Sequence, residues 1–388
     1  MRRIARLAVP CFLVCPLSLS LSASAITETD GPSDAEATGN KVPVVYVVPF
    51  DGQMGTDIHE QMAEEIIEDA LEVKPDVIVY RITSADIDRN YHLPRADAKE
   101  FGMLELEAYR NIVRGFQNKL ADTEQVVWVV DSVGFASLLA LSWEDMYISP
   151  DGRLWGLNMV FDVSQGWSDD DVREKMEEAW EGMGRGFLEM GGHGQFARVL
   201  GSAMMDPEKT LSADFKGREV VWRANTDGMW LVDDDDEQVA NFDAQTAEDT
   251  LLSDGIVDSL DDLMFLLGYR EYEKNENGIE LAERYKEQWR RAYQKCLDNL
   301  RDIETGRGGG TDALRQALNR KRLWEEILRN ERRFNAVERR LTREFGLSKD
   351  RVELIIEGIN DEIRQIRDGR RGGNGRRGGG GRSRGGPT

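Results

Sequence analysis

The sequence predicts an α/β fold, in which a domain with a parallel sheet is followed by a charged helical extension. Three short apolar runs rich in β-branched residues, at Val44–Val48, Val77–Ile82 and Val126–Val130, are typical of strands buried on both faces. Segments with helical spacing of apolar residues separate these runs, and that order implies right-handed parallel units. Beyond Tyr269 the composition changes to charged segments with a helical period.

The first 25 residues have the pattern of a secretory signal peptide. Arginines at positions 2, 3 and 6 precede the apolar stretch Leu7–Leu21, and small residues follow at positions 23–25. No later stretch reaches the roughly 18 apolar residues that a membrane-spanning helix needs. We therefore expect an exported protein without a transmembrane segment, periplasmic or secreted, whose residues 26–42 form a disordered lead-in.

Cysteine content and charge restrict the stability and the partners of the mature chain. Only Cys296 remains after removal of the signal, so no intramolecular disulfide can form and an apolar core must supply the stability. The formal net charge is −22, and the basic signal and tail leave the body more acidic still. Such a field repels nucleic acid, so we expect no nucleic-acid partner for the body.

The first strand should end at a turn made by Asp51 and Gly52. Thr56 is the expected N-cap of the next helix. A further helix over Asp97–Leu120 precedes the third strand. The apolar face of the helix after Thr56 consists of Ile58, Met62, Ile66 and Ala70.

The third strand leads directly into a short helix. The predicted turn is Asp131–Gly134, the helix starts near Gly134, and a second short strand follows at Met146–Ile148. A strand that turns sharply into a helix directs backbone N–H groups and one side chain into the space above the sheet. A catalytic nucleophile would belong at this turn.

This segment, VVWVVDSVGFASLLALSWEDMYISPDGRLWG, resembles a segment of the Clp-type serine peptidases, especially the signal-peptide-peptidase and membrane-associated Ser/Lys branch. Members of this class resemble crotonases, which implies a parallel ββα spiral fold. Their nucleophile is a serine at the helix start. Matching Ala140, Leu141 and Glu144–Tyr147 to the family places Gly134 at the nucleophile position, and a glycine has no nucleophile to offer.

Two further parts of the family's chemistry are replaced. After the second strand the family carries two glycines that contribute to an oxyanion hole, where this chain has Asp86 and Ile87. An acidic side chain there would destabilise a developing oxyanion. The family's catalytic lysine lies in a loop that corresponds to Leu157–Trp167, which contains no lysine. The nearest lysine, Lys175, lies two turns inside the helix predicted over Asp169–Met190.

The resemblance covers Val44–Tyr269 and ends with a closing pattern at Thr246–Asp258. It assigns residues 43–270 to a Clp/crotonase-like domain, with Ser168 as the N-cap of the helix that contains Lys175. It also implies a homo-oligomer, commonly ring-like.

Residues 271–368 are predicted to form the helical extension, and residues 369–388 a disordered Arg/Gly-rich tail. The last helix carries an apolar seam that should dock on a neighbour. Anionic glycans, envelope surfaces and the acidic body are possible partners of the tail, and a flexible tail without a partner is equally open. The four helices are expected at Ile279–Ile303, Thr311–Asn330, Glu331–Phe345 and Ser348–Arg367.

Three side chains are candidates for a displaced catalytic site. Ser132 and Ser137 flank Gly134 and could serve as the nucleophile, although a shift along a turn moves an oxygen farther than catalysis tolerates. Lys175 could be the base if burial lowers its pKa. The alternative is an exposed helix lysine that balances neighbouring glutamates.

The sequence gives no sign of a metal or a cofactor. His59, His92 and His193 are scattered, without a partner at i+4 or a nearby cysteine. The run Asp233–Glu237 has consecutive acids and lacks the alternating ligands of a calcium loop, so we expect a solvated loop.

These observations favour an exported Clp-like pseudoenzyme that binds or scaffolds other proteins and can hold an extended peptide beside a sheet edge. One alternative is an active Ser/Lys endopeptidase that uses Ser137 or Ser132 with Lys175. Another is an assembly platform that presents the C-terminal helices and the Arg tail.

Overall fold

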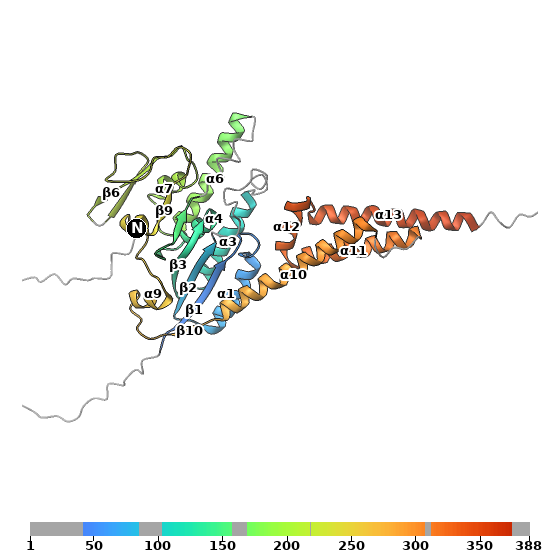
Figure 1. Cartoon of the computed structure of the whole chain (residues 1–388), viewed down its shortest axis with the longest axis horizontal. Helices are drawn as coiled ribbons and strands as arrows, with labels where there is room; N and C mark the ends of the chain where they lie inside the picture. The colour runs from blue at the N-terminus through green and yellow to red at the C-terminus, as the bar shows by residue number, and fades with distance from the viewer. Residues whose placement is uncertain (1–41, 85–102, 157–168, 218, 307–311, 375–388) are drawn as a thin grey trace, which may run out of the picture.

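A mostly parallel sheet of seven strands forms the centre of an α/β body, and a set of long helices projects from it as an arm (Figure 1). The computed structural model describes residues 42–84, 103–156, 169–217, 219–306 and 312–374. The predicted signal peptide, most of the lead-in and the segment around His92 lie outside these residues. The α/β class and the helical C-terminal region are as the sequence predicts.

The strand order in the main sheet is β10-β1-β2-β3-β5-β9, with β4 alongside the first half of β3. All pairs are parallel except β5 with β9. The strands are β1 (Val44–Asp51), β2 (Val77–Ser84), β3 (Glu124–Val133), β4 (Asp145–Ile148), β5 (Arg153–Trp155), β9 (Asn241–Asp243) and β10 (Glu273–Asn275). Because β10 pairs with β1, the sheet reaches past the domain boundary expected at residue 270.

Helices cover both faces of the sheet. On one face, α1 (Glu60–Val73) and α3 (Met103–Lys119) bury residues such as Tyr46, Tyr80 and Val127. On the other face, α9 (Leu260–Leu266) packs on the opposite side chains of the same strands. Both faces of β1, β2 and β3 are therefore buried, which explains their continuous apolar runs. The remaining helices of the body are α4 (Phe135–Ala140), α6 (Asp170–Met190), α7 (Ala197–Ala203) and α8 (Ala244–Asp249).

The prediction of Thr56 as an N-cap is wrong. Helix α1 begins at Glu60, and its N-cap is His59, whose Nδ1 accepts a hydrogen bond of 3.0 Å from the backbone N–H of Gln61. The carboxylate of Asp57 accepts from the backbone N–H of Gln53 and so holds the preceding residues in a turn. Three predicted face residues, Met62, Ile66 and Ala70, are buried on the helix, and Ile58 is buried just before it.

Two other local predictions need correction. Strand β3 continues through Val133 instead of ending at a four-residue turn, because Ser132 pairs with both β2 and β5. Helix α6 is capped by Asp169, whose carboxylate accepts from the backbone N–H groups of Asp171 and Val172, so the predicted cap Ser168 is wrong.

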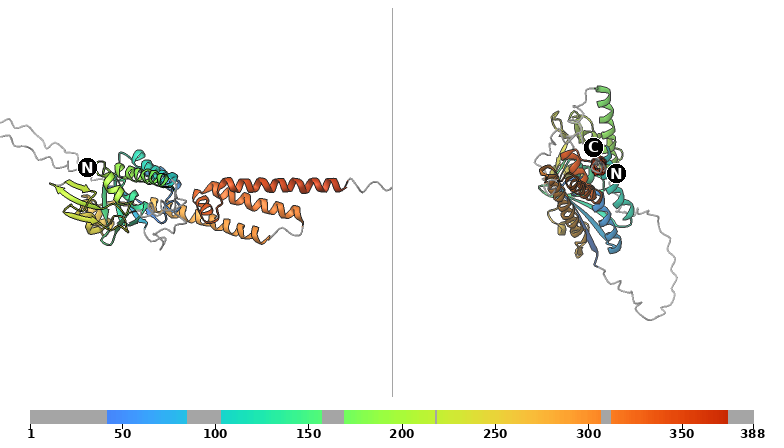
Figure 2. Two further views of the ribbon diagram at one scale, coloured as in Figure 1. Left: turned by 90° about the horizontal axis from the view of Figure 1, so that it is seen from above. Right: turned by 90° about the vertical axis from the view of Figure 1, so that its right-hand side faces the viewer.

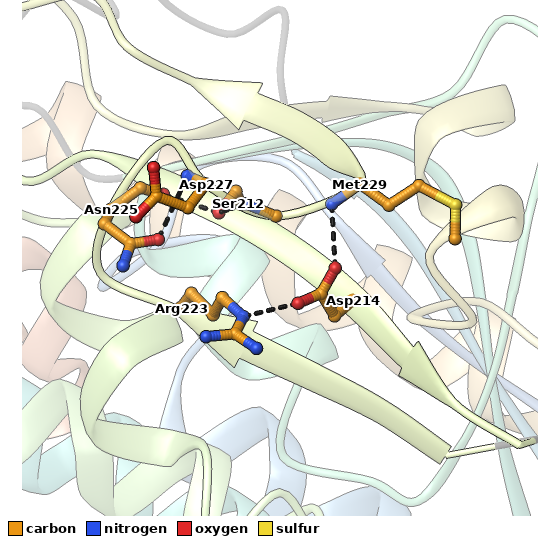
Figure 3. Close-up of polar contacts among 7 residues, drawn as sticks. Ser212, Asp214, Arg223, Asn225, Asp227 and Met229 are labelled. Atoms are coloured by element: carbon orange, nitrogen blue, oxygen red, sulfur yellow. Dashed lines mark hydrogen bonds and ion pairs between the residues drawn. The ribbon is translucent and has the colours of Figure 1, made fainter.

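A separate three-stranded antiparallel sheet consists of β6 (Leu211–Lys216), β7 (Glu219–Arg223) and β8 (Trp230–Asp233), in the order β7-β6-β8. Figure 3 shows how Asp214 ties this sheet together. Its carboxylate accepts from the backbone N–H of Met229 at 2.9 Å and from Nε of Arg223 at 2.6 Å. Residues 234–237, in the predicted solvated loop, are exposed.

The arm consists of α10 (Asn277–Thr305), α11 (Ala313–Arg333), α12 (Asn335–Phe345) and α13 (Lys349–Asn374). Figure 2 shows α13 running along α11. Arg320 pairs with Glu362 between them at 2.7 Å. The predicted apolar seam of the last helix is docked, since Val352, Ile359 and Ile363 are buried. Helix α13 continues to Asn374, into the first residues of the predicted tail, and the rest of the tail lies outside the described residues.

The first helix of the arm packs directly on the body. Helix α10 lies against β1 and α1, and Gly278 permits the approach because a Cβ there would lie 2.4 Å from the carbonyl oxygen of Val47. Farther along, Arg339 of α12 donates to the carbonyl of Gly55 at 2.8 Å. The arm therefore has a defined seat on the body. Within the described ranges, none of the helices is long and apolar enough to cross a bilayer.

Candidate functional site

The turn between β3 and α4 is the place where the sequence predicts a nucleophile. Gly134 stands at this turn with φ 68° and ψ −125°, and its backbone N–H donates to the carbonyl of Trp155 at 3.0 Å. A positive φ favours glycine because a Cβ is strained there. The sharp turn is thus present, and it carries no side chain.

The two serines that flank Gly134 hydrogen bond to each other. Both Ser132 and Ser137 are 0 % exposed, and their Oγ atoms are 3.1 Å apart. The hydroxyl of Ser132 donates to the carbonyl of Arg153 at 3.0 Å, which leaves Ser137 to donate to Ser132. Both hydroxyls therefore brace β3 against β5 and α4.

Lys175 lies in the second turn of α6, where its side chain is exposed. Among the described residues it has no hydrogen-bond or ion-pair partner, and the adjacent Glu174 and Glu178 are exposed as well. Asp86 and Ile87, which replace the family's oxyanion glycines, lie outside the described residues, as does the loop 157–167 that lacks a lysine. The structure thus brings the two serines together and leaves Lys175 exposed.

A cleft of about 700 Å³ opens at the carboxyl ends of β1, β2 and β3. Ligands of open α/β sheets bind at this edge, since the strands end there and the loops diverge. Strand ends form one wall, and α10 of the arm forms the other. The lining residues are Asp51, Gly52, Thr83, Asp131, Glu283, Lys286, Glu287, Arg290, Arg291 and Gln294.

Most charged groups in this cleft already have partners. Asp51 pairs with Arg81 at 2.7 Å, and Asp131 accepts two hydrogen bonds from Arg153, at 2.9 and 2.6 Å. Arg290 reaches past the cleft to Asp57, whose side chain is only 3 % exposed. These pairs fix the walls of the cleft and neutralise much of their charge.

Lys286 differs from these groups. Its side chain is half-buried between α10 and the strand ends, and within the described part of the chain it forms no hydrogen bond or ion pair. Burial lowers the pKa of Lys286, while the carboxylates of Asp51 and Asp57 oppose that shift. On the facing wall, Oδ1 of Asp51 is buried without a hydrogen-bond partner in the described structure. Among the described residues that line the cleft, Lys286 is therefore the cation without a partner.

Sequence reasoning missed Lys286. The residue lies in a helix where acidic and basic residues alternate, ERYKEQWRR, which is typical of an exposed helix surface. Only the packing of α10 over the strand ends distinguishes this lysine from its neighbours. A usable signal was Gly278, which allows one end of this helix to approach a strand.

The histidines and acids form no metal centre in the described ranges, where no group of three or more His, Cys, Asp or Glu side chains could hold an ion. His59 is buried at the seat of the arm and stacks on Tyr285 with ring centroids 6.2 Å apart. Burial, and then the positive charges of Arg339 and Lys349, lower the pKa of His59 to about 3.

Comparison with known proteins gives weak similarities. No protein-family model and no curated protein matches the sequence. A membrane protease specific for a stomatin homolog from Pyrococcus horikoshii is 11% identical over 58% of this chain and 78% of its own, with a TM-score of 0.33. A mutant of a membrane-bound stomatin-specific protease is also 11% identical, over 58% and 84%, with a TM-score of 0.37. A peptidase from Plasmodium falciparum is 14% identical over 55% and 96%, with a TM-score of 0.32.

Proposed function

We propose that this chain is an exported member of the Clp/crotonase-like superfamily that has no peptidase activity and binds or scaffolds other proteins. The conformation of Gly134 carries the proposal. In other α/β enzymes a sharp turn from a strand to a helix carries the nucleophile. In this chain Gly134 occupies that turn, and it has no side chain. Acyl transfer to the protein needs a side-chain nucleophile, so the turn alone cannot perform it.

The neighbouring groups support the same proposal. The hydroxyls of Ser132 and Ser137 are buried and engaged with each other, so neither points freely at a substrate. Lys175 is exposed on α6, and within the described residues it forms no hydrogen bond or ion pair, so it does not activate either serine. A nucleophile needs a base within hydrogen-bond reach, and the described contacts of both serines include no amine.

The test is a cleavage assay with the mature chain, residues 26–388. We expect fluorescently labelled casein to remain intact over a day, at the rate of a buffer control. A Gly134→Ser variant should be equally inactive, because it adds an oxygen without a base. Cleavage by the wild-type chain that disappears in Ser137→Ala or Lys175→Ala would overturn the proposal.

The active Ser/Lys endopeptidase remains the competing hypothesis, and one contact favours it. The two serine hydroxyls lie 3.1 Å apart directly beside the turn, so a small rearrangement could expose one of them. This hypothesis requires Lys175 to approach the turn when substrate binds. A Lys175→Ala variant separates the two readings, because only the peptidase loses activity.

The arm favours a second role for the same protein, as an assembly platform. It projects from the body with a largely charged surface, and Leu354 of α13 is 66% exposed on it (Figure 1). The family resemblance implies a homo-oligomer, which would present several arms together. Light scattering should therefore give a mass above that of one chain. A mature chain that stays monomeric at all concentrations would contradict the platform.

A further inference from the structure

A cation and a carboxylate on facing walls of the cleft under α10 could bind the same ligand. Nζ of Lys286 offers three donors and one positive charge, and the carboxylate of Asp51, whose side chain is 28% exposed, offers an acceptor. The two groups do not pair with each other, because no ion pair joins them within 4.0 Å. Lys286 has no hydrogen-bond or ion-pair partner among the described residues, and the exposed part of the Asp51 carboxylate keeps acceptor capacity beside its bond to Arg81, so one ligand can engage both groups.

We propose that this cleft binds a carboxylate with an adjacent N–H donor, meaning a free amino acid or the C-terminal residue of a peptide. Lys286 binds the carboxylate, and Asp51 accepts from the N–H group. This inference rests on the proposed binding function and assigns it a site. The volume of about 700 Å³ lies within the usual range for small ligands and accommodates the last residues of a peptide.

The charges of the cleft favour a single carboxylate over a phosphate. One ammonium faces the space, whereas phosphate sites usually combine several donors, such as an arginine fork or a helix N-terminus. Arg290 pairs with Asp57, and Arg291 pairs with Glu287, so neither arginine of the lining is a free cation. The exposed Glu283 would repel a dianion more strongly than a monoanion. We expect weak binding, with a dissociation constant of about 5 mM.

The experiment measures how fast Lys286 is methylated by formaldehyde and dimethylamine-borane at pH 8, by mass spectrometry of peptides from the intact mature chain. The probes are N-acetyl-trialanine, its C-terminal amide, and alanine, each at roughly 10 mM. We expect the tripeptide acid or alanine to slow methylation of Lys286 at least about threefold. The exposed Lys175 is the internal control: because the amine of alanine also consumes formaldehyde, protection is measured as the rate of Lys286 relative to that of Lys175. The amide should protect neither lysine.

The result also identifies the source of the carboxylate. Protection by the tripeptide acid alone assigns the site to a peptide C-terminus, and protection by alanine alone assigns it to a free amino acid. Equal protection by the amide, or none by either acid up to roughly 50 mM, overturns the inference.

A second measurement does not depend on lysine chemistry. Saturation-transfer NMR should detect bound N-acetyl-trialanine with the wild-type chain and with Lys175→Met, and should lose the signal with Lys286→Met. Circular dichroism establishes that each variant is folded. Casein cleavage by the wild-type chain would contradict the proposed function without testing the binding site in the cleft. No cleavage together with no protection of Lys286 would overturn only the proposed binding site.

Discussion

The turn at Gly134 and the cleft at Lys286 lie at the carboxyl edge of the same sheet, but they are built from different parts of the chain. Residues adjacent in sequence form the turn, and their polar groups are satisfied by one another and by carbonyls of the neighbouring strand β5. The cleft joins three strand ends to a helix more than 150 residues later, and among its described lining residues Lys286 forms no hydrogen bond or ion pair. The difference places the unpaired cation of this edge on the arm and not at the turn.

The largest effect is expected from disrupting the packing of α10 against β1, because α10 forms one wall of the cleft and no part of the turn. Gly278→Ala places a Cβ 2.4 Å from the carbonyl oxygen of Val47 and 2.8 Å from the ring of Tyr46. We expect a loss of about 3 kcal/mol in the free energy of unfolding by urea, together with loss of ligand at Lys286. Gly358→Ala is the matched control, because nothing lies within 4 Å of its Cβ position. If both variants are equally stable, α10 is not seated as described.

The interior of the arm should respond to pH through Glu331. Both carboxylate oxygens are buried without a partner in the described structure, and burial, then repulsion by Glu338, raises the pKa of Glu331 to about 8. The native state keeps the proton that the unfolded state releases above its ordinary pKa of 4.5, so stability falls as pH rises from 4.5 to 8.

Glu331→Gln should therefore match wild type at pH 4 and exceed it by about 2 kcal/mol at pH 7, measured by urea unfolding. Glu325→Gln, on the exposed side of the same helix, should change stability little at either pH. A gain that does not vary with pH would contradict a buried, protonated Glu331.

The contact between body and arm should weaken in acid through His59. Its pKa is lowered to about 3 in the native state, so the unfolded state takes up the proton first and stability falls as pH drops below 6.5. We expect wild type to lose about 1 kcal/mol between pH 7 and pH 5.5 that His59→Asn, which keeps an N-cap acceptor, does not lose. Thermal unfolding at the two pH values measures this difference. His193→Asn is the control, and an identical acid loss in His59→Asn would contradict the prediction.

The smallest expected effect on the free energy of unfolding is that of Lys286→Met. The substitution keeps the apolar stem and removes an ammonium without a partner, so the free energy of unfolding should change by less than about 1 kcal/mol. Binding of N-acetyl-trialanine should disappear in the same variant. A large loss of stability would mean that Lys286 holds the fold and is not reserved for a ligand.

The sequence predicted the parts of the fold that local pattern controls. The apolar runs of β1, β2 and β3 and the four helices of the arm follow from periodicity, and the strand-to-helix turn was placed at the correct glycine. The cap at His59 was missed because histidine is an uncommon N-cap and the competing Thr56 is a favoured residue type. Pairing of β10 with β1 is a contact across more than 200 residues, which no local pattern encodes.

The candidate site, like the fold, could be predicted only where local sequence determines it. The sequence located Gly134 and the flanking serines, although it could not show that the two hydroxyls bond to each other. Lys286 escaped notice since its role depends on where α10 crosses the sheet edge. Burial of one helix face against distant strands is a tertiary event, and the charge pattern of the helix is compatible with full exposure.

We propose that the edge of the sheet at Gly134 has no activated nucleophile. Intact-mass spectrometry of the mature chain after incubation with a fluorophosphonate, which forms a covalent adduct with activated serines, tests it most directly. We predict an unchanged mass, with full adduct formation on trypsin in a parallel reaction. A single adduct mapped to Ser132 or Ser137, and absent in Lys175→Ala, would contradict the account.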